Sequence, residues 1–126
     1  IMASIIEKET GMASERAQIA GVFVSRMKKR MRLQTDPTII YGLGDKFDGN
    51  LKRKHLRDQE NAYNTYHIKA LPPSPIALPG QKSIHAALHP NMTSALYFVG
   101  KGDGSHYFSA TLKEHEKAVR QYQLNQ

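Results

Sequence analysis

The sequence has 126 residues, no cysteine, and 18 lysines and arginines against 11 acidic residues, a net charge of +7. This length allows one domain with a modest core and excludes two, and the absence of cysteine excludes a disulfide framework and thiolate chemistry. The basic balance favours an acidic partner, such as nucleic acid, anionic lipid or an acidic cell-wall polymer, without choosing among them.

Residues 1–10 predict a helix, because strong helix formers fill this stretch and no glycine or proline occurs before Gly11. At about 100° per residue, one side of this helix is an apolar stripe that ends in a carboxyl. The stripe consists of Met2, Ile5, Ile6 and Glu9. Glu7 lies roughly 200° from Glu9 and is expected to face water beside Lys8.

A carboxyl on an apolar stripe is desolvated, so its pKa rises and it can hold a proton near neutral pH. A general acid needs this property, which makes Glu9 a candidate catalytic residue. The alternative is that Glu9 sits at the edge of the stripe and pairs with a lysine or arginine.

The next predicted helix begins at Ser14 as N-cap, with Glu15 in the first turn, and runs to about Lys29. Its apolar residues recur at helical spacing and are Ile19, Val22, Phe23 and Met27. The basic residues at its end, Lys28, Lys29, Arg30 and Arg32, are interpreted as a solvated helix end.

Asp36 before Pro37 predicts a helix cap, so residues 38–43 are expected to form a short helix that Gly44 stops. Residues 51–57 are the most basic run and predict a solvated loop or short helix.

Residues 61–66, Asn-Ala-Tyr-Asn-Thr-Tyr, bring amides, hydroxyls and aromatic rings together where helical periodicity ends. Such a cluster suits a sugar, which offers hydroxyls at its rim and apolar faces for stacking. An ordinary loop is the alternative.

The proline-rich residues 71–75 predict a stiff extended segment, and residues 81–88 predict a helix that ends before Pro90. Residues 95–99 and 106–109 are β-prone, and the glycines between them predict a hairpin.

The pattern Thr111-Leu112-Lys113-Glu114 predicts a capping box that opens a polar helix reaching about Tyr122. Together these elements predict an α+β fold, with a helical core and a β-hairpin or small sheet.

Metal and nucleic-acid sites find little support in the sequence. His85 and His89 share one helix face, but Ala86 stands where a metalloprotease has glutamate and no third ligand is near. The basic residues 52–57 have no aromatic neighbours, which disfavours a nucleic-acid surface. We therefore expect no metal, no cofactor and no nucleic-acid partner.

Six motifs, in the same order and with similar gaps, resemble the catalytic domain of the YceG-like endolytic murein transglycosylases, the MltG type. They are Ala3-Ser4-Ile5-Ile6-Glu7-Lys8-Glu9-Thr10, Arg32-Leu33-Gln34-Thr35-Asp36-Pro37-Thr38, Ala62-Tyr63-Asn64-Thr65-Tyr66, Leu71-Pro72-Pro73, Pro79-Gly80 and His89-Pro90. The resemblance runs from Ile1 to about Tyr122, almost the whole chain.

This resemblance implies cleavage of the β-1,4 bond between N-acetylmuramic acid and N-acetylglucosamine in peptidoglycan strands, leaving a 1,6-anhydro-muramyl end. It also implies a lysozyme-like active site and an enzyme anchored in the bacterial cytoplasmic membrane, facing the periplasm and cell wall, beside peptidoglycan synthases. We expect residues 1–126 to be the catalytic domain, a fragment that an anchoring membrane helix and a LysM-like domain precede.

Lytic transglycosylases of the lysozyme-like group carry their catalytic glutamate directly before a serine or threonine. Glu9-Thr10 matches that pattern and Glu7-Lys8 does not, so the resemblance assigns the acid to Glu9, with Glu7 as the rival. The residues expected to position the substrate are Gln34, Asp36, Tyr63, Asn64 and Tyr66. Asp36 is alternatively only a helix cap, and a non-catalytic peptidoglycan-binding module is the alternative function.

Overall fold

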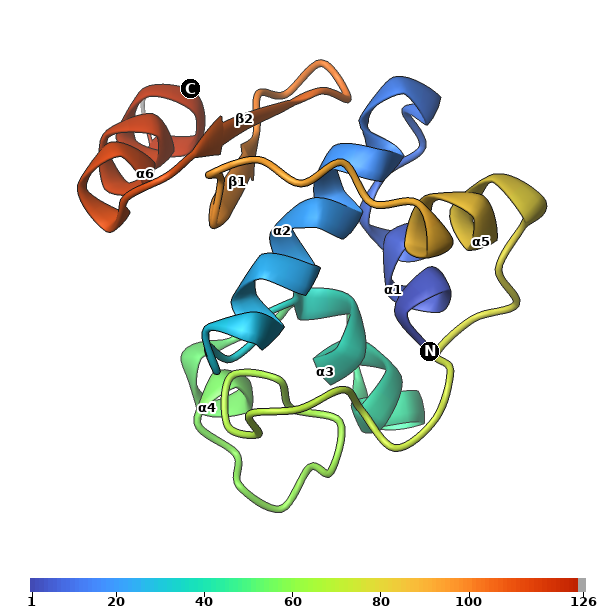
Figure 1. Ribbon diagram of the computed structural model, residues 1–126. Helices are drawn as coiled ribbons and strands as arrows, with labels where there is room; N and C mark the ends of the chain where they lie inside the picture. Colours follow the sequence, from blue (N-terminus) through green and yellow to red (C-terminus); the bar gives the residue numbers. More distant parts are fainter. Residues whose placement is uncertain (125–126) are drawn as a thin grey trace.

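The computed structural model describes residues 1–124, which form a mostly helical domain with one two-stranded antiparallel sheet (Figure 1). The elements are α1 (Met2–Glu9), η1 (Ala13–Glu15), α2 (Arg16–Lys28), α3 (Asp36–Leu43), η2 (Gly44–Lys46), α4 (Arg53–Leu56), α5 (Gln81–Leu88), β1 (Tyr97–Gly100), β2 (His106–Ser109), α6 (Leu112–Val119) and the π-helical turn η3 (Arg120–Leu124). The expected helical core with a hairpin is confirmed. Within the described residues, no helix is both long and apolar enough to cross a membrane.

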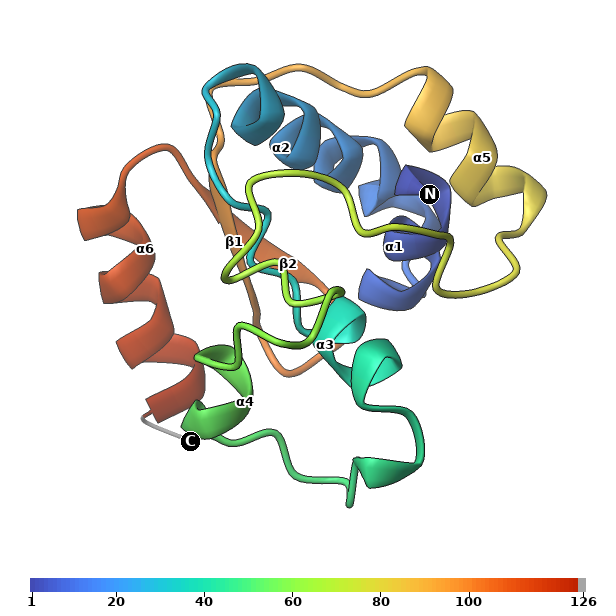
Figure 2. The same ribbon diagram turned by 90° about the horizontal axis from the view of Figure 1, so that it is seen from below.

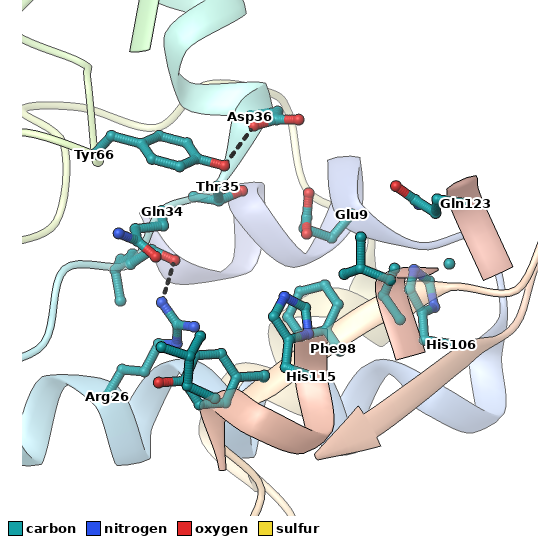
Figure 3. Close-up of a pocket in the computed structure, with 16 residues that line it drawn as sticks. Glu9, Arg26, Gln34, Thr35, Asp36, Tyr66, Phe98, His106, His115 and Gln123 are labelled. Atoms are coloured by element: carbon teal, nitrogen blue, oxygen red, sulfur yellow. Dashed lines mark hydrogen bonds between the residues drawn. The ribbon is translucent and has the colours of Figure 1, made fainter. Parts of the chain in front are cut away.

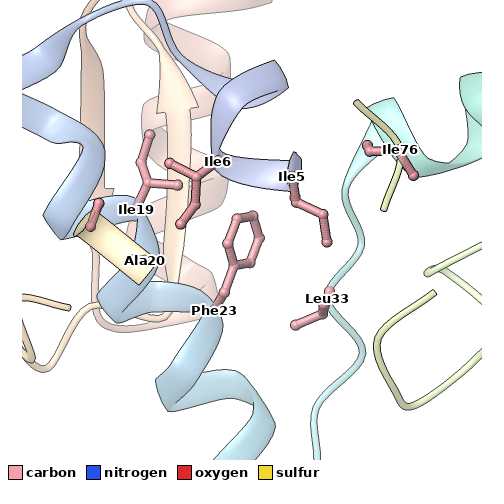
Figure 4. Packing of buried hydrophobic residues seen from close by; sticks show 8 residues of the cluster. Ile5, Ile6, Ile19, Ala20, Phe23, Leu33 and Ile76 are labelled. Atoms are coloured by element: carbon pink, nitrogen blue, oxygen red, sulfur yellow. The ribbon is translucent and has the colours of Figure 1, made fainter. Parts of the chain in front are cut away.

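The core forms around α1, which contacts α2, α3 and α5 (Figures 1 and 2). Ile5 and Ile6 are 0% exposed and pack with Phe23 of α2 and with Leu33 (Figure 4). The apolar stripe expected on this helix is therefore confirmed. Because α1 is packed on several sides, the last residue of the helix, Glu9, has a fixed position.

The hairpin packs against the helical body and carries α6 on its other side (Figure 1). Phe98 of β1 meets Phe23 edge to face, with ring centroids 5.8 Å apart. In the register of the sheet, Gly100 pairs with His106. The connecting turn places Gly102 and Gly104 at φ of 93° and 92°, a left-handed region that glycine enters without steric cost.

Two predicted helix caps are wrong. Ser14 makes no cap, because the short η1 turn precedes α2 and the cap position of α2 falls on Glu15. Asp36 is the first residue of α3, whose N-cap is Thr35, and the Asp36 side chain is not bonded to the helix end. The cap at Thr111 is confirmed, since its hydroxyl accepts a hydrogen bond from the Glu114 N–H.

Candidate active site

A cleft of about 520 Å³ opens beside the C-terminal end of α1 (Figure 3). The end of α1, the loop before α3 and Tyr66 contribute to its lining, as do Arg26 of α2, the hairpin, α6 and η3. A second hollow of about 630 Å³ shares Glu9, Gly100, His106 and Gln123 with this cleft. The two hollows thus adjoin and form one depression, with Glu9 at the junction.

Glu9 is half-buried at this junction, and its environment favours the protonated form. Burial raises the pKa of Glu9 to about 7, and the negative charge of Asp36 adds to the increase. The Thr35 hydroxyl opposes the increase in pKa by favouring the carboxylate. The expected desolvation of this carboxyl is confirmed, and near neutral pH Glu9 can both hold and release a proton.

Glu7 is held in a different environment, outside the cleft. Its Oε1 accepts hydrogen bonds from the Gly80 N–H, at 2.7 Å, and from the Ser83 hydroxyl, at 2.9 Å. These two bonds lower the pKa of Glu7. The side chain was expected to face water, and it remains accessible while it connects α1 to the start of α5. The two glutamates of α1 therefore differ in both position and ionisation.

The loop that enters α3 presents three consecutive residues to the cleft, namely Gln34, Thr35 and Asp36. Gln34 has a φ of 53°, a left-handed backbone conformation that is uncommon for a residue with a side chain. Thr65 stabilises this conformation, because its carbonyl accepts from the Gln34 N–H and its hydroxyl accepts from the Thr35 N–H. Gln34 is left exposed at the cleft while Thr35 is buried.

Asp36 is bonded to Tyr66 rather than to the end of its own helix. The Tyr66 hydroxyl donates to Asp36 Oδ1 at 2.9 Å, and both residues line the cleft (Figure 3). Burial and the charge of Asp36 raise the pKa of Tyr66, so the phenol stays protonated and remains a donor. This bond orients a carboxylate next to Glu9.

Tyr63 and Asn64, the other two predicted substrate contacts, do not line this cleft. Asn64 is 0% exposed; its amide donates to the carbonyls of residues 55, 56 and 58 and its oxygen accepts from the Tyr66 N–H. The Tyr63 hydroxyl is hydrogen-bonded to that of Ser74. Asn64 thus has no surface for a ligand, and its contribution to the cleft is to hold the chain at Tyr66.

Several residues that line the cleft were not predicted from the sequence, and most of them come from segments distant from Glu9 in the chain. They are Arg26, Tyr97, Phe98, His106, His115 and Gln123. A signal existed for Arg26, which follows Ile19, Val22 and Phe23 at helical spacing, as Glu9 follows Ile5 and Ile6. No local pattern marks the others.

Glu15 holds His106 at the cleft. Its Oε2 accepts from the His106 N–H and its Oε1 is bonded to His106 Nδ1, both at 3.0 Å. The pair joins the start of the α2 segment to the hairpin and fixes the imidazole ring beside the depression. Within residues 1–124, no group of three or more histidine or acidic side chains is placed to hold a metal ion.

The opposite environments of the two glutamates predict opposite effects on stability. The pKa of Glu9 is raised from 4.5 to about 7, so the wild type loses stability as pH rises through this range, and Glu9→Gln removes that loss. In urea unfolding at pH 8, we expect the free energy of unfolding of Glu9→Gln to exceed that of the wild type by roughly 3 kcal/mol. This difference should vanish near pH 4.

Glu7→Gln is the matched control. The lowered pKa of Glu7 means that its carboxylate stabilises the fold above pH 4.5, so Glu7→Gln should be less stable than the wild type at pH 8 and approach it in acid. Parallel pH dependence of the two variants in urea unfolding would contradict the assigned environments.

Comparison with known proteins gives one consistent result. The profile of the YceG-like family matches residues 1–121. An endolytic murein transglycosylase of Bacillus subtilis is 47% identical over 96% of this chain, and one of Streptococcus pneumoniae is 29% identical over 96%. A crystal structure of a YceG-like protein from Listeria monocytogenes superposes with a TM-score of 0.85, at 46% identity over 93% of the chain.

The chain spans only part of these proteins, namely 33% of the Bacillus protein, 23% of the Streptococcus protein and 38% of the Listeria structure. The similarity nevertheless covers both walls of the cleft, from Glu9 through Tyr66 to His115. On this match, the chain belongs to the YceG-like family.

Proposed function

We propose that this chain is the catalytic domain of an endolytic lytic transglycosylase that cleaves the bond between N-acetylmuramic acid and N-acetylglucosamine in peptidoglycan. The observation that carries this proposal is a glutamate with a pKa of about 7 where two adjoining hollows meet. The names of the Bacillus and Streptococcus relatives support the substrate class. The active site is lysozyme-like in the sense that one glutamate before a threonine, at the end of a helix, supplies the acid.

In the first step, protonated Glu9 donates its proton to the glycosidic oxygen. The bond from this oxygen to C1 of the muramyl residue breaks as positive charge develops on the sugar, and N-acetylglucosamine leaves with a free hydroxyl. The muramyl N-acetyl oxygen stabilises the positive centre from the opposite face, so no second carboxylate is needed there.

In the second step, the Glu9 carboxylate takes the proton from the muramyl O6 hydroxyl. The O6 atom then bonds to C1 and closes the 1,6-anhydro ring, which consumes no water and returns Glu9 to its protonated form. A pKa of about 7 serves both steps, because the group exchanges its proton easily near neutral pH. General acid–base catalysis of this kind contributes about 10²–10⁴-fold, and substrate positioning supplies much of the rest.

Gln34, Asp36 and Tyr66 are the proposed positioning residues, because all three line the cleft with Glu9. The Tyr66–Asp36 bond fixes two of these side chains relative to each other before substrate binds. Such preorganisation reduces the entropy lost on binding. The net charge of +7 suits a wall polymer that carries carboxylates.

The family resemblance also supports a location for the longer protein. We propose that it is anchored in the cytoplasmic membrane by a segment upstream of residues 1–126, with this domain facing the cell wall and working beside peptidoglycan synthases. Fractionation of cells that express the full-length protein should recover it with the inner membrane. Recovery in the soluble cytoplasmic fraction would contradict this location.

Product masses from purified glycan strands test the reaction. The wild type and Glu7→Gln should both release strands with 1,6-anhydro-muramyl ends, because Glu7 only joins α1 to α5. Glu9→Gln should lose at least about 10²-fold in rate, since the amide can neither donate nor accept the required proton.

The same measurement separates the alternatives. Reducing ends in place of anhydro ends would indicate a hydrolase, and loss of cleavage in Glu7→Gln alone would overturn the assignment of the acid. Binding of strands without cleavage by any version would indicate a peptidoglycan-binding module.

The pH–rate profile tests the coupling between Asp36 and Glu9. Because the charge of Asp36 raises the pKa of Glu9, Asp36→Asn should lower that pKa and move the loss of activity at high pH to a lower pH. Tyr66→Phe is the control, since it removes the hydrogen bond but keeps the carboxylate, and should cause no downward shift. An unchanged profile in Asp36→Asn would show that the two carboxyls are not coupled.

A further inference from the structure

Arg26 is a buried cation without an anionic partner at the wall of the cleft. It is 6% exposed, and it donates to three backbone carbonyls, those of residues 96, 32 and 33, at 2.6, 2.9 and 3.2 Å. The two ion pairs in the described part of the chain, Lys52–Asp48 and His106–Glu15, do not involve it. Burying a charge without an opposite charge is costly, which makes Arg26 unusual among structural arginines.

The Nη2 group of the Arg26 guanidinium remains available to a ligand. Its Nε and Nη1 atoms make the three carbonyl bonds, and Nη2 makes no hydrogen bond with any residue that the structure describes. The Tyr97 ring covers one face of the guanidinium, and the Arg26 Cζ atom lies 4.9 Å from the centroid of this ring. Since Arg26 lines the same cleft as Glu9, the remaining donors belong to the wall of that cleft (Figure 3).

A second unpartnered polar group lies on the same wall. The His115 ring stacks on the ring of Tyr97, with the ring centroids 5.0 Å apart and the ring planes at 20°. Its Nδ1 atom is buried and has no hydrogen-bond partner among residues 1–124. Burial and the charge of Arg26 lower the pKa of His115. Arg26 and His115, which come from different helices, thus both line the cleft, and each has a ring or guanidinium nitrogen without a partner among the described residues.

The carboxyls that line the cleft do not supply the missing partner. Glu9 is protonated in part near neutral pH, and Asp36 is bonded to Tyr66. No carboxylate contributes to the pKa of Arg26, which burial lowers. A neutral sugar hydroxyl could accept from Nη2 but would leave the positive charge uncompensated, whereas a carboxylate accepts the hydrogen bond and also compensates the charge.

We propose that Arg26 and His115 form a subsite for a carboxylate carried by the muramyl part of the substrate. This inference rests on the proposed function and adds a specificity to it. The carboxylate has two sources in such a strand: the lactyl group of muramic acid where the stem peptide has been removed, or the stem peptide itself where it is present. In either case the cleft distinguishes muramyl units that carry a negative charge from neutral sugars.

Chemically blocked substrates test the subsite. Peptide-free strands and peptide-bearing strands are each prepared in native form and with their carboxylates converted to methylamides. For the wild type, blocking should reduce kcat/KM on the order of tenfold, mainly through KM, because a charge-assisted hydrogen bond is lost. An effect in peptide-free strands assigns the lactyl carboxylate, and an effect in peptide-bearing strands assigns the stem peptide.

Variants show whether Arg26 and His115 cause this preference. Arg26→Gln and His115→Gln should cleave native and blocked strands with more similar kcat/KM values, and Arg26→Lys should keep part of the preference. Arg32→Gln is the matched control, since Arg32 is exposed, does not line the cleft and carries the same charge. It should leave the ratio between native and blocked strands unchanged.

Equal cleavage of native and blocked strands by the wild type would overturn the subsite. So would a purely structural effect, in which Arg26→Gln slows both substrates by the same factor. If Arg26→Gln does not fold, the wild-type comparison and His115→Gln still decide. If the wild type cleaves no strand, the proposed function fails separately, and titration of Glu9→Gln with native and blocked strands tests carboxylate binding alone.

Discussion

Burial of one face of α1 is the constraint on which the site depends. Ile5 and Ile6 are fully buried against α2 and the loop before α3, and Glu9 continues their face one turn later. The packing that removes water from two isoleucines therefore also removes it from a carboxyl and raises its pKa. Glu7, on another face of the same helix, is bonded to the start of α5 and stays ionised. A single short helix thus separates a proton donor from a structural carboxylate.

Elements whose signal is local were predictable from the sequence. Helix α5 and strand β2 have the expected bounds, because capping, proline and β-propensity act over a few residues. The error at Asp36 has the opposite origin. A local rule assigned its carboxylate to the helix end, whereas the structure uses it for Tyr66, which lies 30 residues away. Local preference yields when a distant partner offers a better-placed hydrogen bond.

The candidate site was predictable only along one wall. Helical periodicity identified Glu9, and the motif residues Gln34, Asp36 and Tyr66 line the cleft with it. The opposite wall depends on how the hairpin packs against α2 and how α6 packs against the hairpin, which no local pattern encodes. Residues close in the sequence also differ in their access to the cleft. Tyr66 lines the cleft, but Asn64, two positions earlier, is buried in the loop.

The two walls differ in charge in a way that bears on the chemistry. On one wall, desolvation disfavours the charged form of Glu9, and the Tyr66 hydroxyl donates a hydrogen bond to the Asp36 carboxylate. On the other wall, no carboxylate compensates the charge of Arg26. A substrate carboxylate bound at Arg26 would neutralise that cation and add negative charge to the cleft. The substrate would therefore supply the counter-charge that the described side chains do not give to Arg26, while burial and Asp36 keep Glu9 able to hold its proton.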